Sequence, residues 1–192
     1  MVVSMFIAID GLDGCGKSFA AETVRAALVA EGRRVTVREH PSDRLFGRMC
    51  QTMLLKRGRL PVAVASVLLF SDMLGTSRLA RLSSRRGEDL IAVRYGLSCY
   101  FLHERPARIV HRLFVSFMCA PDLDIVIDVE PEVAVARISK RGLTEEVFEN
   151  PRSMARARAG MLSVPGIMVV DGGGSMESTS DDILSLIRSR RP

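Results

Sequence analysis

The sequence predicts an α/β fold in which helices flank a five-stranded parallel sheet, giving three layers. Apolar runs alternate with helical patterns along the whole chain, and the runs suit strands that are buried on both faces. The length of 192 residues and the apolar content of 47% suit one domain with a sizeable core. We therefore expect residues 1–192 to form a single domain.

The expected strands are short apolar runs. They cover Val3 to Ile9, Arg34 to Arg38, Asp89 to Val93, Leu123 to Val129 and Ile167 to Val170. The expected helices lie between the strands, where the pattern changes to helical spacing. They cover Lys17 to Ala30, Leu45 to Leu55, Val62 to about Ser84, Pro106 to Phe117, Glu132 to Lys140 and Asp181 to Arg190. Ligands of such folds bind at the carboxyl ends of the strands, so we expect the site there.

A phosphate-binding loop follows the first strand. Gly11-Leu12-Asp13-Gly14-Cys15-Gly16-Lys17-Ser18 matches G-x-x-x-x-G-K-[ST] at every fixed position. The glycines let backbone N–H groups point at phosphate oxygens, and the helix that begins near Lys17 adds its positive end. A solvent-facing Lys17 would neutralise the β- and γ-phosphates, and the Ser18 hydroxyl would hold Mg²⁺. The alternative is a chance match in a turn, but the flanks favour a P-loop NTPase-type fold that binds nucleotides.

Charge and composition narrow the choice of partners. The net charge of +5 and the pI of about 9.4 would suit nucleic acid, but the arginines are dispersed. Only two tyrosines and no tryptophan are available for base stacking. We expect small-molecule nucleotides and no nucleic acid. The first apolar run is too short for a signal sequence or a membrane span, so we expect a cytoplasmic protein without a membrane partner. The sequence leaves open whether the protein forms a homodimer.

The four cysteines form no C-x-x-C pair and have no histidine at ligand spacing. Cys50, Cys99 and Cys119 suit reduced and mostly buried thiols. Cys15 is the expected exception, because a thiol beside Lys17 and a helix N-terminus has a lowered pKa and is sensitive to oxidation.

A second segment resembles the thymidylate kinase family. It reads Pro121-Asp122-Leu123-Asp124-Ile125-Val126-Ile127-Asp128-Val129-Glu130-Pro131-Glu132-Val133-Ala134 and continues through Arg137 to Lys140-Arg141-Gly142. Chains of that family typically read Pro-Asp-Leu, a strand, Asp-Val-x-Pro-Glu and then Arg-Gly. Together with the phosphate loop, the resemblance runs from about Phe6 to the C-terminus. It implies ATP-dependent phosphorylation of a nucleoside monophosphate, foremost dTMP to dTDP, with ATP and Mg²⁺ as cofactors.

The resemblance also implies roles for individual residues. Those at ATP are Gly11, Asp13, Gly14, Cys15, Gly16, Lys17, Ser18 and Arg137. Those at the acceptor nucleotide are Asp13, Phe70, Arg94, Tyr95, Ser98 and Phe148. The implied catalytic residues are Lys17, Arg94 and Arg141, and the implied metal ligand is Ser18. A lid is implied at about 141–155.

Several of these residues also have a purely structural interpretation. An aromatic residue in an apolar helix, such as Phe70, normally packs in the core. Arg94 is interpreted as a phosphate ligand because it would lie beside the phosphate loop, although a strand end also suits a surface charge. Arg137, Lys140 and Arg141 suit a solvated helix end as well as a lid.

Four positions depart from the family pattern. Val93 replaces an aspartate, and three arginines are replaced by Leu74, Val147 and Gln51. Phosphoryl transfer depends on positioning and charge stabilisation, so these losses bear on both rate and acceptor affinity. Candidate substitutes for the lost arginines are Arg48, Arg78 and Arg152. Two other functions therefore stay open: a P-loop kinase of a different nucleotide or small acceptor, and a nucleotide-binding protein that has lost turnover.

Overall fold

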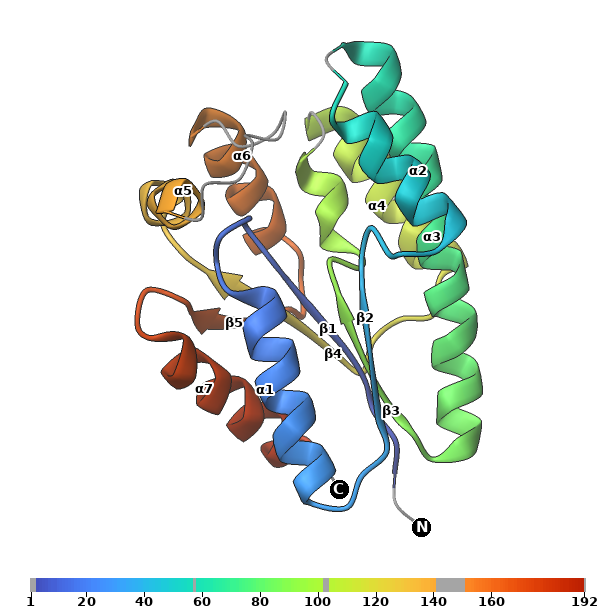
Figure 1. Cartoon of the computed structure of the whole chain (residues 1–192), viewed down its shortest axis with the longest axis vertical. Helices are drawn as coiled ribbons and strands as arrows, with labels where there is room; N and C mark the ends of the chain where they lie inside the picture. The colour runs from blue at the N-terminus through green and yellow to red at the C-terminus, as the bar shows by residue number, and fades with distance from the viewer. Residues whose placement is uncertain (1–2, 57, 102–103, 141–150, 192) are drawn as a thin grey trace.

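The computed structural model describes residues 3–56, 58–101, 104–140 and 151–191. Its elements pack around one sheet (Figure 1). The strands are Phe6–Gly11 (β1), Val35–Glu39 (β2), Asp89–Val93 (β3), Leu123–Asp128 (β4) and Met168–Asp171 (β5). Their order across the sheet is β2-β3-β1-β4-β5, and every pairing is parallel. The predicted α/β fold with a five-stranded parallel sheet is confirmed.

Helices cover both faces of the sheet. They are Lys17–Ala30 (α1), Leu45–Leu54 (α2), Arg59–Arg86 (α3), Glu104–Phe117 (α4), Pro131–Lys140 (α5), Pro151–Leu162 (α6) and Met176–Ser189 (α7), with a 3₁₀ turn at Leu97–Phe101 (η1). Figure 1 shows α1 and α7 together over one face and α3 and α4 on the other side. The start of β1 and the end of α7 lie at the opposite end of the sheet from the loop that joins β1 to α1 (Figure 1).

Strand β1 explains how the core is divided. Successive side chains of a strand point to opposite faces. Ile7 and Ile9 are fully buried in the cluster that includes α1 and α7, whereas Phe6 and Ala8 pack with α3 and α4. Asp10 continues the second face, so a carboxylate lies at the end of an otherwise apolar row.

The observed boundaries differ from the expected ones in a few places. Helix α3 is longer at both ends, and Gly87 ends it in the left-handed conformation that glycine adopts without strain (φ 67°). Helix α7 begins five residues earlier than expected, because the Ser175 hydroxyl caps it by accepting from the Ser178 N–H. Turn η1 was not expected, and α6 begins within the range where a lid was expected. Residues 151–155 of the expected lid belong to α6, and 141–150 lie outside the described residues.

Helix α3 is long and apolar enough, over Leu60–Arg86, to cross a membrane by length and composition. Here it packs on the sheet and carries buried polar side chains. The Thr76 hydroxyl accepts a hydrogen bond from Arg44, and the Ser77 hydroxyl accepts one from the Cys119 N–H at 2.7 Å. These partners lie before α2 and after α4, so the polar residues of α3 fasten it to its neighbours.

Candidate active site

The phosphate loop lies at the carboxyl end of β1, as expected. Gly14 and Gly16 have φ values of 83° and 98°, which glycine adopts readily. A Cβ on Gly14 would lie 2.6 Å from the carbonyl oxygen of Ala134 in α5, and one on Gly11 would lie 2.6 Å from that of Ile127. The loop therefore curls closely against β4 and α5, and only glycine fits at these positions.

Lys17 is buried in the first turn of α1, so the expectation that it faces solvent is wrong. Its Nζ donates to the carbonyl oxygens of Gly11 at 3.0 Å and Leu12 at 2.7 Å, and lies 3.4 Å from Oδ1 of Asp13. The ammonium group is thus held inside the curl of the loop. This is the position from which it neutralises phosphate charge in loops of this type.

Ser18 follows Lys17 and is exposed. Its hydroxyl donates to Oε1 of Glu39, at the end of β2, at 2.7 Å. A hydroxyl next to a carboxylate is a set of hard oxygen donors, which is what Mg²⁺ prefers. The residues at this point therefore fit the metal that the motif implies.

Arg94 and Asp13 join the phosphate loop to the end of β3. Arg94 Nη2 and Nε donate to Oδ1 of Asp13 at 2.6 and 3.1 Å, and Arg94 Nη1 lies 3.5 Å from Oε1 of Glu39. Burial alone would raise the pKa of Asp13, but Lys17 and Arg94 hold it below its usual value. Arg94 has a φ of 58°, a strained conformation for a residue other than glycine. The backbone thus turns this guanidinium toward the loop.

Cys15 does not behave as expected. The residue is buried, and burial raises the pKa of its thiol despite the nearby Lys17 ammonium. The prediction of a lowered pKa and an oxidation-sensitive thiol is therefore wrong. Cys15 is 2% exposed, so the loss of solvent around its thiol outweighs the charge of Lys17.

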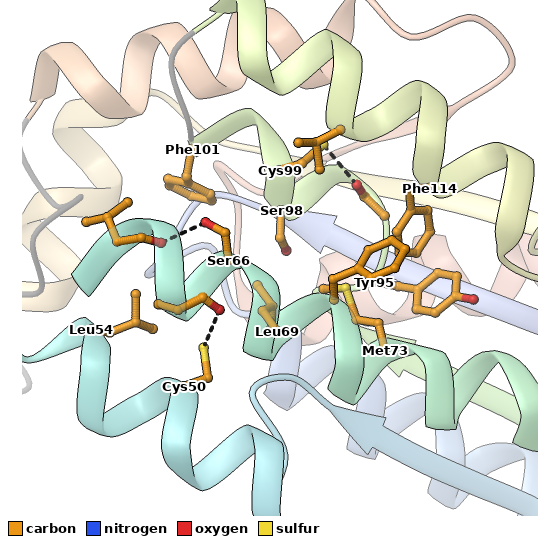
Figure 2. Close-up of a pocket in the computed structure, with 15 residues that line it drawn as sticks. Cys50, Leu54, Ser66, Leu69, Met73, Tyr95, Ser98, Cys99, Phe101 and Phe114 are labelled. Carbon is orange, nitrogen blue, oxygen red and sulfur yellow. Dashed lines mark hydrogen bonds between the residues drawn. The ribbon is translucent and has the colours of Figure 1, made fainter. Parts of the chain in front are cut away.

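An apolar pocket lies between α2, α3, η1 and α4 (Figure 2). Its lining includes the implied acceptor residues Phe70, Tyr95 and Ser98. Phe70 is half-buried and packs edge-on against Phe114, so it both lines the pocket and belongs to the core. The Tyr95 hydroxyl donates to the carbonyl oxygen of Cys119 at 3.1 Å, and burial raises the pKa of Tyr95 to about 12. Tyr95 therefore contributes its ring to the wall and keeps its hydroxyl in the core.

A polar hollow adjoins this pocket. It is open, with a volume of about 670 Å³ against about 70 Å³ for the apolar pocket, and Leu54 lines both. The charged and amide residues of its lining are Arg38, Arg44, Arg94, Glu39, Asp43 and Gln51. The two spaces therefore adjoin at Leu54, one of them apolar and the other polar, with three arginines and two carboxylates.

Arg44, in the loop before α2, is held against α3. Its Nη2 donates to the carbonyl oxygen of Asp72 at 2.9 Å and lies 3.2 Å from Oδ1 of the same residue. A Cβ on Gly75 would lie 2.4 Å from Nη1, so the absence of a side chain there makes room for the guanidinium. Nη1 itself makes no hydrogen bond within the described residues.

Asp72 organises this loop. Its carboxylate accepts from the Ser42 N–H and hydroxyl and contacts Nδ1 of His40 at 2.8 Å. Burial alone would raise the pKa of Asp72, but His40 and the Ser42 hydrogen bonds hold it far below its usual value. The cis peptide bond between His40 and Pro41 lies in the same loop. Asp72 thereby fixes the loop that carries Arg44.

The departures from the family pattern lie in two environments. Val93 is fully buried within the sheet and Leu74 packs in the core below α3, so neither faces the hollow as a charged residue would. Gln51 lines the hollow, and its amide donates to the carbonyl oxygen of Pro41 at 3.2 Å. The suggested substitutes Arg48, Arg78 and Arg152 are exposed, and none lines the hollow.

Of the remaining implied residues, the structure describes Arg137. Arg137 of α5 is half-buried, and its Nη2 donates to the carbonyl oxygen of Gly174 at 3.2 Å. Its Nη1 is buried without a partner within residues 3–140 and 151–191, apart from the short undescribed gaps. Arg141, Val147 and Phe148 lie outside the described residues.

The sequence analysis did not single out four residues of the site, namely Asp10, Glu39, Arg44 and Asp72. Asp10 had a signal, because a carboxylate inside an otherwise apolar strand is costly unless it has a purpose. Gly75 inside α3 was a second signal, since glycine in a helix costs about 1 kcal/mol and marks a close approach. Glu39 and Arg44 carry no such mark in the sequence.

The parallel sheet and the glycine loop around Lys17 define a P-loop phosphotransferase, and the adjoining acceptor surface is typical of a nucleoside monophosphate kinase. The family model described as "Thymidylate kinase" matches residues 9–183. The chain belongs to the thymidylate kinase family, so the resemblance is confirmed.

Individual relatives agree with this assignment over nearly the whole chain. A "Probable thymidylate kinase" of Pyrobaculum aerophilum is 31% identical over 190 residues, covering 95% of this chain and 96% of the relative. One of Thermoplasma acidophilum is 28% identical, with 97% of each chain covered. A "Thymidylate kinase" of Xanthomonas campestris pv. campestris is 29% identical over 91% of this chain and 78% of its own length.

Proposed function

We propose that the protein transfers the γ-phosphate of ATP to dTMP, producing ADP and dTDP. The observation that carries this proposal is the pair of adjoining spaces beside the phosphate loop, one apolar around Phe70 and the other carrying the guanidinium groups of Arg44 and Arg94, with Leu54 common to both. A nucleoside monophosphate has the same division between an apolar base and a charged phosphate.

ATP would bind through the N–H groups of the loop from Gly11 to Ser18. Lys17 would neutralise the β- and γ-phosphates, and Arg137 would contribute from α5. Ser18, with Glu39 alongside, would hold Mg²⁺, which neutralises charge on the phosphates during transfer. Each of these groups lowers the cost of bringing two anionic phosphates together.

The acceptor base would enter the apolar pocket with its face on Phe70 and an edge near Ser98. Its phosphate would reach Arg94 and also Arg44, whose Nη1 lacks a hydrogen bond within the described part of the chain. Asp13, between Lys17 and Arg94, would lie at the acceptor's sugar and keep the arginine oriented. Arg44 thus supplies the positive charge for which the family pattern has an arginine at the position of Leu74.

No covalent enzyme intermediate is needed. An oxygen of the acceptor phosphate attacks the γ-phosphorus of ATP, and the bond to the β,γ-bridging oxygen breaks, leaving ADP. The residues contribute by holding the two phosphates in line and by neutralising the charge between them. Arg141, with the lid at about 141–155, completes the proposal by closing over the transferring group.

The proposal also covers the domain organisation, the binding partners and the cellular location of the protein. We assign the whole chain to one kinase domain that acts on small-molecule nucleotides in the cytoplasm, without nucleic acid or membrane. A homodimer remains a prediction, which sedimentation of the purified protein would test.

A kinase of a different nucleotide is the second candidate, and one observation favours it. Val93 and Leu74 are core residues where the family pattern has an aspartate and an arginine, so the acceptor pocket is built differently. A nucleotide-binding protein without turnover is the third candidate, for the same reason.

One experiment separates these candidates. The protein is incubated with Mg-ATP and each nucleoside monophosphate in turn, and the diphosphate product is measured directly. The proposal requires dTDP to form fastest. Faster formation of another diphosphate would establish the second candidate, and binding of ATP without any diphosphate would establish the third.

A further inference from the structure

Two carboxylates lie together beneath the site, on neighbouring strands. The register of β1 and β4 pairs Ala8 with Asp124 and Asp10 with Val126. Asp10 and Asp124 are therefore diagonal neighbours on one face of the sheet, about 7–8 Å apart at the backbone by ordinary strand geometry. Asp10 is 1% exposed and Asp124 is partly buried.

Each carboxylate has one oxygen that is buried and unpaired. Oδ2 of Asp10 and Oδ1 of Asp124 have no hydrogen-bond partner among the residues that the structure describes. Oδ1 of Asp10, in contrast, accepts from the Ser98 hydroxyl at 3.3 Å. A buried oxygen without a partner is uncommon, and two from adjacent carboxylates share one explanation.

The cations near this pair donate no hydrogen bond to it among the described residues. On α1, the Lys17 ammonium group lowers the pKa of Asp10, but it donates to the loop carbonyls and Asp13. On α6, the Arg158 guanidinium is bound to Asp128 and Glu130.

The other titratable neighbours are uncharged or weakly polar. On η1 they are Cys99, whose pKa is raised to about 12 by burial and by Asp10, and Tyr100. The Tyr100 ring lies against that of His111 of α4, whose pKa is lowered by burial. None of these groups neutralises a second negative charge at the pair.

Two ionised carboxylates this close would repel each other in a region of low dielectric. Burial raises the pKa of Asp10, and burial together with Asp10 raises the pKa of Asp124 to about 7. A proton on one carboxyl group allows it to donate to the other, which satisfies both unpaired oxygens.

We propose that Asp10 and Asp124 hold a single proton between their two unpaired oxygens, and that Asp124 thereby positions Asp10 and Ser98 beside the phosphate loop. Asp124 is then a positioning residue. It touches neither nucleotide, but it fixes the carboxylate that orients the Ser98 hydroxyl in the wall of the apolar pocket.

The proposal gives a sign for the dependence of stability on pH. The folded pKa of Asp124 lies above the ordinary value of 3.8, so the folded state binds a proton that the unfolded state has lost. The contribution is fully present below about pH 4 and is lost as pH rises through about 7. Over that range, one retained proton changes the ratio of folded to unfolded protein by up to about tenfold per pH unit.

The test compares the wild type with Asp124→Asn. The amide has the shape of the protonated acid and can donate to Asp10, but it does not titrate. Unfolding by urea is measured from pH 5 to 8, with the exposed Asp182→Asn of α7 as the matched control. We expect the wild type and the control to lose stability relative to Asp124→Asn over this range. Equal pH slopes in all three proteins would overturn the proposal.

A second measurement does not require the variant to fold. The infrared band of a protonated carboxylic acid is recorded in the wild type between pH 5 and 8. We expect the band at pH 6 and its loss as pH rises past about 7. A spectrum of fully ionised carboxylates at pH 6 would overturn the shared proton.

The positioning role rests on the proposed function and has its own readout. We expect the KM for the acceptor to rise between pH 6 and 8 in the wild type and to stay level in Asp124→Asn, while the KM for ATP changes alike in both proteins. The same dependence of the acceptor KM on pH in Asp124→Asn and in the wild type would overturn the positioning role. Unfolding and infrared spectra do not depend on activity, so a failure of the proposed function would remain distinguishable.

Discussion

At the scale of single residues, Lys17 combines two duties that the sequence motif does not separate. Its ammonium group holds the carbonyl oxygens of Gly11 and Leu12 while remaining inside the phosphate loop. The motif predicts contact with phosphate, but it carried no information about burial, because burial depends on how α5 and β4 close around the loop.

Replacing Lys17 by alanine should weaken ATP binding by roughly ten- to a hundred-fold. A charge-assisted hydrogen bond contributes about 1.5–3 kcal/mol, and Lys17→Ala removes at least one such bond to phosphate. Titration calorimetry with Mg-ATP measures the loss, with Lys56→Ala at an exposed lysine as the control. Equal ATP affinity in the two variants would mean that the loop is only a turn. Urea unfolding should also show a lower stability for Lys17→Ala, since the two carbonyl groups lose their donor.

Arg44→Ala should raise the KM for dTMP by roughly ten- to a hundred-fold and leave the KM for ATP unchanged. The expected loss is one charge-assisted contact to the acceptor phosphate, about 1.5–3 kcal/mol. Arg48→Ala is the matched control, because Arg48 is an exposed arginine of α2 that does not line the hollow. If Arg48→Ala impairs dTMP binding more than Arg44→Ala does, the assignment of Arg44 is wrong.

Alkylation of the native protein should label Cys119 before Cys15. Cys15 is 2% exposed and burial raises its thiol pKa, so little reactive thiolate is available there. Cys119 is more exposed. Mass spectrometry of peptides from briefly alkylated protein measures the order, with urea-unfolded protein as the control in which both thiols react. Rapid labelling of native Cys15 would show that the loop opens.

At the scale of elements, the packing between α6 and η1 places Ser98 within the apolar pocket. Glycine inside a helix costs about 1 kcal/mol relative to alanine, so propensity alone predicts that Gly160→Ala stabilises α6. A Cβ at this position would lie 2.4 Å from Cδ1 of Tyr100, a buried ring of η1.

We therefore expect Gly160→Ala to destabilise the protein by about 1–3 kcal/mol, the usual cost of overpacking. Urea unfolding measures the change. The control is Ala155→Gly at an exposed position of α6, where only propensity acts and a loss of about 1 kcal/mol is expected. A Gly160→Ala variant that is more stable than the wild type would show that α6 and η1 can move apart to accept the added methyl group.

Element types were predictable from the sequence where a single pattern ran through the element. Helix α1 was predicted with both ends correct, because Gly16 and Gly32 bracket a regular apolar spacing. Turn η1 was not, since Leu97–Phe101 is short and is held by contacts with α4 and α6 that are distant in sequence. The acceptor hollow was missed for the same reason: Arg44 and Asp72 meet only when α2 folds onto α3.

At the scale of the whole molecule, buried carboxylates govern the acid side of the stability profile. Asp89 lies at the beginning of β3, and its carboxylate is fully buried. It binds Arg33 and Arg191 and accepts from the Met5 N–H, thereby tying both ends of the chain to β3. Burial alone would raise its pKa, but these partners hold the pKa below its usual value.

The stabilisation from Asp89 is therefore present above about pH 4 and is lost as pH falls through the lowered folded pKa. We expect Asp89→Asn to cost about 3–5 kcal/mol at neutral pH, the usual penalty for removing one partner of a buried ion pair. Urea unfolding measures this cost, and the variant should also lose less stability than the wild type below pH 4. Asp43→Asn, at an exposed aspartate, should show neither effect.

The pair of contacts at Asp13 has a consequence for how the two nucleotides influence each other. A single oxygen, Oδ1, accepts from Lys17 on the donor side and Arg94 on the acceptor side. With the nucleotides bound as proposed, ATP phosphates that attract Lys17 would leave this oxygen to Arg94, and an acceptor phosphate on Arg94 would leave it to Lys17. Coupling free energies between sites are reciprocal, so ATP changes the affinity for the acceptor by the same factor as the acceptor changes the affinity for ATP. Because the two sites share this one carboxylate oxygen, we expect the free energies of binding ATP and the acceptor to be coupled before phosphoryl transfer begins.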